Sequence, residues 1–326
     1  MEVEGINDDG ADYLDCLTNL IDDTANVSTA DEPIPQTCRP HQSLSYNGHK
    51  PKWWKNLCGK ATKSQKRAMT EILRDYQLPR TPYGSFLNWK EIFPACSEIW
   101  LELGFGRGEN LLALAHRKSR NTAFVGAEIH QPGVGTICQR MQEAIRESIY
   151  WSDYVAYSAV LDPHHHDSTT TTDAPIANDD FRDMQGDAYS NVRIYVGDGV
   201  KLLPYISSSS LTAVLVTFPD PFPREQQKQW RLIQTATIVE MHRILKTGGR
   251  LFLATDHEGY HDWTHSVINI LNQEKTRFIL VDPCPDRVEW LPAISRYEHK
   301  GWDEGRITRL SCWQAFRDEE TNLILA

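Results

Sequence analysis

Three glycines and a later glutamate have the types and the spacing to hold a nucleotide-like ligand. Gly104, Gly106 and Gly108 follow a short apolar run, and Glu128 comes twenty residues after the last of them. Glycine has no Cβ and tolerates positive φ, so a glycine turn lets the backbone approach a ligand closely. A carboxylate at the end of the next strand can accept hydrogen bonds from both hydroxyls of a ribose. The pattern predicts an adenosine-containing cofactor, while Glu109 at the third glycine position of a dinucleotide fingerprint disfavours NAD.

A second carboxylate, that of Asp220, lies between two prolines. Asp220 has Pro219 on one side and Pro221 on the other, directly after the apolar run of residues 211–218. Proline restricts its own backbone and that of the residue before it, so the carboxylate is held in one place at low entropic cost. Open α/β sheets bind ligands at the carboxyl edge of their strands, which is where this run would end. The pattern therefore predicts that Asp220 positions a ligand.

Strand-like and helix-like patterns alternate around these residues. We expect strands at residues 99–103, 121–129, 191–198, 211–218 and 250–255 and helices at residues 62–76, after Gly108, at 135–148, 199–205 and 228–245. Gly248 and Gly249 are a stop signal for the last of these helices. Such alternation is typical of a parallel sheet covered by helices on both faces.

Length and composition exclude several protein classes. A chain of 326 residues, 40% of them apolar, can hold one large α/β domain with extensions or two small domains. Apolar runs stay well below the roughly 18 residues of a membrane span, and no secretory or transit signal is visible, so we expect a cytoplasmic or nuclear location and no membrane. The seven cysteines lack a C-x-x-C pair, which favours free thiols and argues against a zinc site.

The net charge of −10 looks wrong for a nucleic-acid-binding protein, but its distribution is uneven. Residues 1–35 carry ten acids and neither Lys nor Arg, and residues 152–190 carry eight Asp and one Arg. Without these two stretches, the 44 acids and 34 bases become 26 acids and 33 bases, a charge of +7. The remainder of the chain is therefore mildly basic, as nucleic-acid binding requires.

We divide the chain into three parts. Residues 1–45 form an acidic tail expected to be disordered, residues 46–95 a basic and aromatic extension, and residues 96–326 the main domain, with an inserted loop at 148–190. Trp53 and Trp54 stand among five lysines between residues 50 and 63, a composition that suits phosphate contact and base stacking, although paired tryptophans also anchor cores. The polar run at His164, His165 and His166 is interpreted as incidental, so no metal site is predicted.

Five motifs, taken in order, resemble the tRNA (guanine-N7-)-methyltransferase family. They are ELGFGRGENLLALA, VGAEIHQPGV, FPDPFPR, LKTGGRLFLATDHEGY and SRYEHKGWDEG. The resemblance covers about residues 60–317 apart from the insertion. It implies a Rossmann-like class I methyltransferase fold, α/β with a mostly parallel central sheet, S-adenosylmethionine as the cofactor and tRNA as the substrate. The cofactor-binding positions that it implies are Glu102, Gly104, Gly106, Gly108, Glu128, Ile129, Asp198, Gly199 and Asp220.

On the substrate side, the resemblance implies that Asp220 is the catalytic residue. The substrate-binding positions are Arg224, Asp256, Ser295, Arg296, Tyr297 and Glu298. Alternative roles are a helix cap for Asp198 and Asp256 and a surface ion pair for Glu298.

Methylation of guanine N7 makes modest demands on a protein. N7 carries an in-plane lone pair, so no base must first remove a proton, and the task is to align this lone pair with the methyl group. The product ring is cationic. A fixed carboxylate such as Asp220 can hydrogen-bond the opposite edge of the guanine and stabilise the positive charge as it develops.

The chain departs from the family pattern after Asp220. Phe222 stands where the family usually has Trp, Arg224 where it has Lys, and residues 225–231 replace a dense His/Lys/Arg cluster. Fewer cations make fewer phosphate contacts. Two alternatives to the tRNA enzyme therefore stay open: a methyltransferase of the same fold acting on another RNA, a protein or a small molecule, and a non-catalytic adaptor. The family also includes eukaryotic members that need a β-propeller (WD-repeat) partner, and the sequence does not decide whether this chain does.

Overall fold

The computed structural model describes residues 59–82, 84–119, 121–147 and 189–317. These residues all belong to one compact unit of the chain. The predicted acidic tail 1–45, the paired tryptophans, the three consecutive histidines and nearly all of the predicted insertion 148–190 lie outside the described residues. Among the described helices, none has the length and apolarity that crossing a membrane requires.

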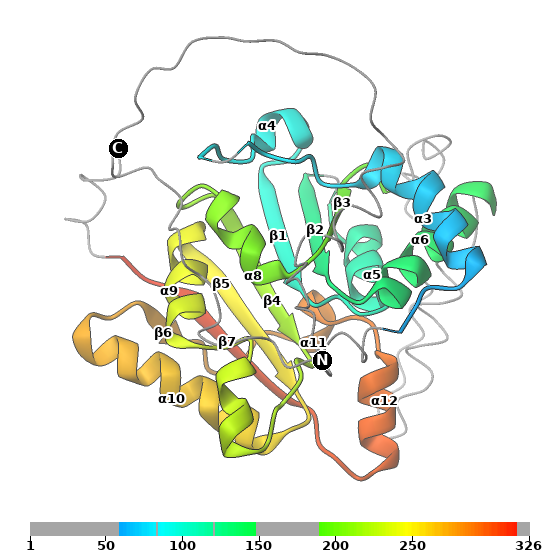
Figure 1. Ribbon diagram of the computed structural model, residues 1–326. Coiled ribbons are helices and arrows are strands. Elements are labelled where there is room, and N and C mark those ends of the chain that lie inside the picture. Colours follow the sequence, from blue (N-terminus) through cyan, green and yellow to red (C-terminus); the bar gives the residue numbers. More distant parts are fainter. Residues whose placement is uncertain (1–58, 83, 120, 148–188, 318–326) are drawn as a thin grey trace, which may run out of the picture. The chain divides into compact units, whose positions relative to one another are not determined.

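Within the described residues, seven strands form one sheet in the order β3-β2-β1-β4-β5-β7-β6 (Figure 1). Neighbouring strands from β3 to β5 are parallel, whereas β7 is antiparallel to both β5 and β6. The strands are β1 (Glu98–Leu103), β2 (Thr122–Glu128), β3 (Val192–Val196), β4 (Leu211–Thr217), β5 (Leu245–Thr255), β6 (Phe278–Leu280) and β7 (Arg309–Ala315). The predicted mostly parallel α/β sheet of the Rossmann-like class I methyltransferase fold is confirmed.

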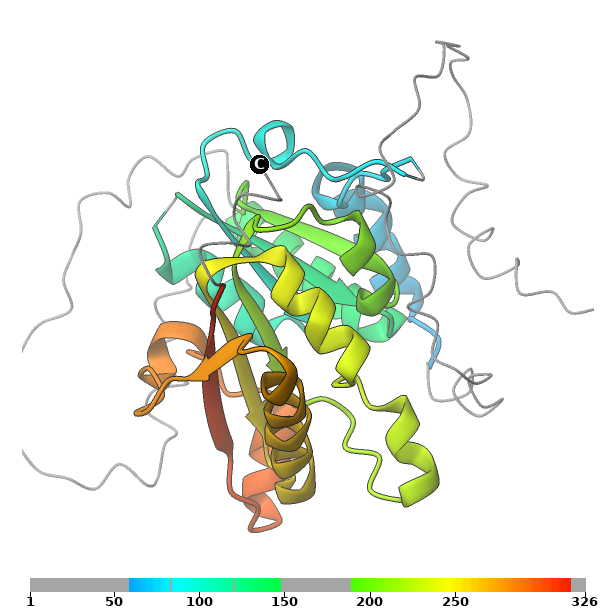
Figure 2. The same ribbon diagram turned by 90° about the vertical axis from the view of Figure 1, so that its left-hand side faces the viewer.

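Helices cover both faces of the sheet, as Figures 1 and 2 show together. They are α3 (Lys63–Tyr76), α4 (Trp89–Ile92), α5 (Glu109–Arg117), α6 (Gln131–Glu147), α8 (Gly199–Leu202), α9 (Thr235–Ile244), α10 (Glu258–Glu274), α11 (Arg287–Trp290) and α12 (Arg296–Asp303), with the 3₁₀ helices η3 (Leu203–Tyr205) and η4 (Glu225–Trp230). Strand β1 serves both cores because its side chains alternate in direction. Leu101 and Leu103 pack with α8, α9 and α10, and Trp100 packs with α3, α5 and α6.

Helix α3 begins where the sequence predicts and packs on the domain. Thr62 caps it with a capping box, in which the Thr62 side chain accepts from the Gln65 backbone and the Gln65 side chain accepts from Thr62. The predicted apolar face of Met69, Ile72 and Leu73 is buried in the same core as α5 and α6. The described end of the predicted 46–95 extension is thus part of this core.

The helix predicted at residues 228–245 starts too early, although it ends within one residue of the predicted position, and its predicted stop signal is wrong. The chain forms η4, then a loop, and α9 starts only after Gln234. Buried Arg231 donates to the carbonyl of Pro221 over 2.9 Å, which draws this segment back against the preceding loop. At the other end Leu245 is already paired with Leu211 of β4, and the ladder resumes at Arg250 after a bulge. The glycines at 248 and 249 therefore lie within β5 and do not stop a helix.

Candidate active site

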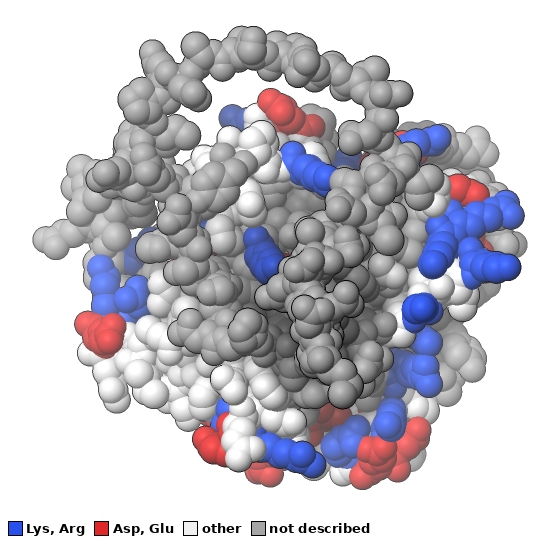
Figure 3. All heavy atoms as spheres, in the orientation of Figure 1, with Lys and Arg blue, Asp and Glu red and all other residues white. Residues whose placement is uncertain are grey.

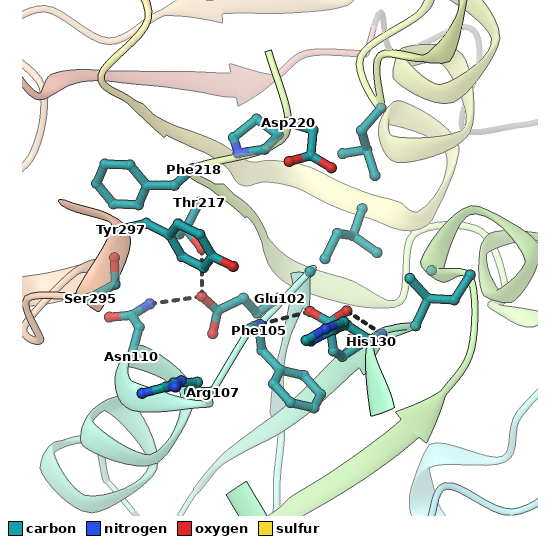
Figure 4. Close-up of a pocket in the computed structure, with 18 of the residues that line it drawn as sticks. Glu102, Phe105, Arg107, Asn110, His130, Thr217, Phe218, Asp220, Ser295 and Tyr297 are labelled. Carbon is teal, nitrogen blue, oxygen red and sulfur yellow. Dashed lines mark hydrogen bonds between the residues drawn. The ribbon is translucent and has the colours of Figure 1, made fainter. Parts of the chain in front are cut away.

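A cavity of about 650 Å³ opens at the carboxyl ends of the parallel strands. Its wall is made by residues that follow β1, β2, β4 and β5, by the start of α8 and by α12. Twelve of the predicted site residues line it: Glu102, Gly104, Gly106, Glu128, Ile129, Asp198, Gly199, Asp220, Asp256, Ser295, Arg296 and Tyr297. Three do not: Gly108, Arg224 and Glu298. Figure 4 shows Asp220, Tyr297 and Glu102 around the same space.

The glycine loop shapes the floor of the cavity. Gly108 has φ +78° at the N-cap of α5, and a Cβ there would lie 2.4 Å from Ile137 of α6. Only glycine satisfies both conditions, so Gly108 sets the packing of α5 on α6 without reaching the cavity. Gly106, with φ +59°, lines the cavity, and its N–H donates to Glu128 Oε2 over 2.8 Å.

Glu128 is held in place at the end of β2 by backbone donors. Its second oxygen, Oε1, accepts from the His130 N–H over 2.7 Å. Burial raises the pKa of Glu128, while the hydrogen bonds from His130 and Gly106 lower it in part. A carboxylate oxygen can accept more than one hydrogen bond, so both oxygens can still receive donors from a ligand in the cavity.

The Glu102 carboxylate belongs to a small polar network that contains two oxygen atoms without a hydrogen-bond donor in the described part of the chain. Glu102 Oε1 accepts from Thr217 Oγ1 over 2.8 Å and from Asn110 Nδ2 over 3.3 Å (Figure 4). Glu102 Oε2 and Asn110 Oδ1 are buried and have no hydrogen-bond partner among the described residues. Burial raises the pKa of Glu102 to about 7, against the effect of the Thr217 and Asn110 hydrogen bonds. Two orphaned acceptors on hydrogen-bonded neighbouring side chains call for a ligand that donates hydrogen bonds.

Asp220 stands on a loop whose two aromatic residues have left-handed backbone. Phe218 has φ +47° and Phe222 has φ +39°, conformations that cost bulky residues free energy and cluster at functional sites. Asp220 remains accessible from the cavity, yet the cavity walls remove enough water to raise its pKa, and nearby His130 lowers it in part. Asp220 in turn raises the pKa of Glu128, so the two carboxylates are electrostatic neighbours.

Arg231 fixes this loop from behind. The side chain is 2% exposed and lies over the rings of Tyr260 and Trp263 of α10. Besides its bond to Pro221, it donates to the carbonyl of Phe222 over 3.3 Å. It therefore ties the backbone beside Asp220 to α10.

Glu298 has a different role from the predicted nucleotide contact. It is fully buried, accepts from Arg287 Nη2 over 2.8 Å and from Thr308 Oγ1 over 2.9 Å, and does not line the cavity. The pair is buried, unlike the surface ion pair that was the alternative, and Glu298 stands outside the cavity where the predicted substrate contact would be made. It anchors α12, whose N-cap Ser295 and exposed Tyr297 do reach the cavity.

The remaining predicted positions fall into two groups. Asp256 lines the cavity and pairs with Arg306 Nε over 2.7 Å, and Asp198 lines it while capping α8 through Val200 N–H. Arg224 is exposed beside η4 and away from the cavity lining. Within η4, Lys228 is paired with Glu225 at 2.6 Å. Residues 225–231, the η4 strip, already have fewer cations than the family pattern, and this ion pair neutralises one more.

Sequence reasoning missed several residues of this site. Asn110, Thr217 and His130 contact or flank the predicted carboxylates, and Arg107 lines the cavity. Arg107, Asn110 and His130 lie inside the quoted motifs and Thr217 directly precedes one, a position that could have drawn attention to them. Arg231 and Arg287 carried no local signal, because their partners lie about ten residues away on other elements.

The site lies within the part of the chain that is similar to known proteins. The model of a family described as "Putative methyltransferase" matches residues 97–307, which include every predicted site residue. The chain belongs to this methyltransferase family. The match, together with curated relatives, confirms the resemblance from the motifs. One relative, from Acidithiobacillus ferrooxidans, is 28% identical over 66% of this chain and 71% of its own length.

A second relative, from Caulobacter sp., is 24% identical over 72% of this chain and 82% of its own length. Both are named tRNA (guanine-N(7)-)-methyltransferase. Among solved structures, one described as "Structure of an Antibiotic Related Methyltransferase" is 12% identical, covers 71% of this chain and 92% of its own, and has a TM-score of 0.42. The fold assignment of this methyltransferase rests on its sheet order and not on that likeness.

Proposed function

We propose that this protein transfers the methyl group of S-adenosylmethionine to N7 of a guanosine in tRNA. The observation that carries the proposal is that Glu128 and Asp220 line the same cavity at the carboxyl ends of the parallel strands, where the first is placed to hold a ribose and the second to position a substrate. Family membership and the names of the curated relatives support the same reaction.

The donor groups of S-adenosylmethionine fit the unused acceptors of the cavity. The orphaned Glu102 Oε2 and Asn110 Oδ1 would accept from the α-ammonium group, and Glu128 would accept from the ribose hydroxyls. Gly106 leaves open space beside the loop, where no Cβ stands in the way. When bound, the cofactor supplies an activated methyl group on a sulfonium.

The protein's own residues then have to orient the acceptor. Guanine N7 needs no general base, so Asp220 does not remove a proton from it. The ionised Asp220 carboxylate accepts hydrogen bonds from the N–H groups of the guanine edge opposite N7. Its negative charge stabilises the ring as positive charge develops. The prolines at 219 and 221, and Arg231 behind them, keep the carboxylate in place.

The proposal is tested by incubating the purified chain with labelled S-adenosylmethionine and unmodified tRNA, followed by chemical cleavage specific for N7-methylguanosine. We expect cleavage at one guanosine, lost in Asp220→Asn while S-adenosylmethionine binding is retained. Transfer by the chain alone would exclude a requirement for a β-propeller partner. Methyl transfer to a protein or small-molecule acceptor but not to tRNA would contradict the proposal.

The second candidate is a methyltransferase that acts on another substrate. The observation that favours it is the η4 strip, where Lys228 is neutralised by Glu225 and leaves Arg224 as the exposed cation beside it. Replacing tRNA by protein or small-molecule fractions in the same assay separates the two candidates.

A further inference from the structure

The side of the cavity opposite η4 carries the cations that η4 lacks. Three exposed lysines stand at the start of α3: Lys60, Lys63 and Lys66. None of the three makes an ion pair among the described residues, and the first turn of α3 contains no acid. The positive end of the helix dipole adds to their charge.

Local contacts bring this end of α3 to the rim of the cavity. Gln65 Nε2 donates to the Pro132 carbonyl over 3.1 Å and to Thr136 Oγ1 over 3.2 Å, both at the start of α6. A Cβ on Gly59 would lie 3.8 Å from Pro132. Pro132 is two residues after His130, which lines the cavity. The start of α3, which carries the three lysines, therefore packs on the start of α6, close to the cavity wall at His130.

Further cations continue across the mouth of the cavity. Arg107 and Arg296 line it, are exposed and make no ion pair within the described ranges. Lys300 lines it too, held loosely by Glu304 at 3.7 Å. Figure 3 shows Lys and Arg side chains gathered along the side of the molecule on which Figure 1 places α3 and α12. Tyr297, 63% exposed between these cations, offers a ring on which a base can stack.

We propose that the phosphate backbone of the RNA substrate crosses the mouth of the cavity from the start of α3 to α12, and not along η4. We call the residues Lys60, Lys63, Lys66, Arg107, Arg296 and Lys300 the α3–α12 track. A polyanion binds where cations are exposed and unpaired, because each neutralised phosphate releases counterions. The track supplies five such cations beside the cavity, whereas η4 and its flanks supply Arg224. The inference rests on the proposed function, since it names the surface that this function needs.

The test compares two pairs of charge reversals of equal size. Lys63→Glu with Lys66→Glu alters the track, and Lys90→Glu with Lys201→Glu alters two exposed lysines outside it. Acidic residues are favourable in the first turn of a helix, and the Thr62–Gln65 capping box is untouched, so α3 is expected to fold in the track variant. A third variant, Arg224→Glu, probes the η4 side. Filter binding to tRNA is measured between 50 and 200 mM salt, and methyl transfer at saturating tRNA is measured separately.

We expect the track pair to weaken tRNA binding by a factor of about ten or more and to flatten the log–log salt slope by about one to two. The control pair and Arg224→Glu are expected to stay within about threefold of the unaltered protein. Affinity for S-adenosylmethionine is expected to be unchanged in all three.

Equal losses in the track and control pairs, or a larger loss in Arg224→Glu, would overturn the track. The proposed track would also be overturned if the affinity of the unaltered protein for tRNA did not depend on salt concentration. Failure of the proposed function can be distinguished from failure of the track. In that case the unaltered protein would bind tRNA through the track but would not methylate it.

Discussion

The two halves of the cavity are built in different ways. The cofactor half, at the ends of β1 and β2, uses glycine and backbone N–H groups, and the key contact joins Gly106 to Glu128 within one strand–helix–strand unit. The substrate half, the Asp220 loop and α12, is held by arginines from other elements. Arg231 ties the loop to α10, Arg287 anchors Glu298, and Arg306 pairs with Asp256.

This difference determines whether a substitution affects the ligand contacts directly or from a distance. A change in the cofactor half alters the groups that touch the ligand and leaves the rest of the site standing. A change in the substrate half can act from a distance, through an arginine that never reaches the cavity. The predictions below separate these two behaviours.

The largest effect is expected at Asp220, the residue proposed to contact the substrate. Asp220→Asn keeps the shape of the loop and removes the negative charge, so kcat should fall by a factor of about 10²–10³, the loss seen when one electrostatic contact to a transition state is removed. The resemblance also gives Asp220 as a cofactor-binding position, but the proposed ammonium and ribose contacts are Glu102, Asn110 and Glu128. The dissociation constant for S-adenosylmethionine, measured by calorimetry, should therefore change by less than about threefold. An equal loss in cofactor affinity would mean that the two halves are not separate.

The anchor of α12 should matter for stability. Glu298→Gln leaves Arg287 without its charged partner, and since Arg287 keeps some contact with water we expect a loss of about 2–3 kcal/mol, below the full cost of breaking a buried pair. Urea unfolding measures it. Glu258→Gln, in the largely exposed pair with Arg309, is the matched control and should cost less than about 0.5 kcal/mol. Similar losses in both variants would argue against a buried anchor.

Arg231 should act on turnover rather than on cofactor binding. Arg231→Lys can keep a positive charge but cannot bond Pro221 and Phe222 together, so we expect kcat to fall about tenfold, the equivalent of one lost hydrogen bond to a charged group. Arg317→Lys is a control of similar burial, because Arg317 also donates to backbone carbonyls, those of Leu245 and His242.

Both arginine variants should lower the melting temperature, which simple loss of a buried arginine explains. Only Arg231→Lys should lower kcat at a temperature where both proteins are folded. Equal kcat values for the two variants would leave Arg231 a purely structural residue.

The last effect belongs to Glu102 and depends on pH, and it is absent above about pH 7. The pKa of Glu102 is raised to about 7 in the folded protein, so Glu102 is mostly protonated below that pH and must lose a proton to receive an ammonium group. Affinity for S-adenosylmethionine should therefore weaken by up to about tenfold per pH unit below 7 and level off above it. Calorimetry between pH 5.5 and 7.5 measures this, and Glu102→Gln should flatten the profile.

The raised pKa of Glu102 also predicts how the stability of the folded protein depends on pH. A carboxyl group whose folded-state pKa is raised binds more protons when folded, so its ionisation destabilises the ligand-free protein as pH rises from about 4.5 to 7. Glu102→Gln should remove that part of the pH dependence. A stability profile in this window that is identical in Glu102→Gln and the unaltered protein would contradict a raised pKa.

The contrast between the halves also explains how much the sequence could predict. Gly106, Glu102 and Glu128 lie within one unit whose strand, turn and helix patterns are local, and the cavity contains them as expected. The position of Asp220 followed from its prolines and the strand before it. These are short-range consequences of backbone geometry, which a sequence pattern expresses directly.

Long-range pairing could not be predicted in the same way. The motif containing Glu298 suggested a substrate contact, but Arg287 buries its carboxylate behind α12. The helix expected from residue 228 was displaced because Arg231 bonds to Pro221. Neither arginine stands in a periodic pattern, and their partners are set by the tertiary fold.

The central claim is that N7 of a tRNA guanosine receives the methyl group. The most direct test compares a tRNA transcript made with guanosine with one made with 7-deazaguanosine, in which a C–H replaces N7. The proposal predicts that both transcripts bind with similar affinity and that only the first accepts labelled methyl groups. Equal methyl transfer to the 7-deazaguanosine transcript would contradict it.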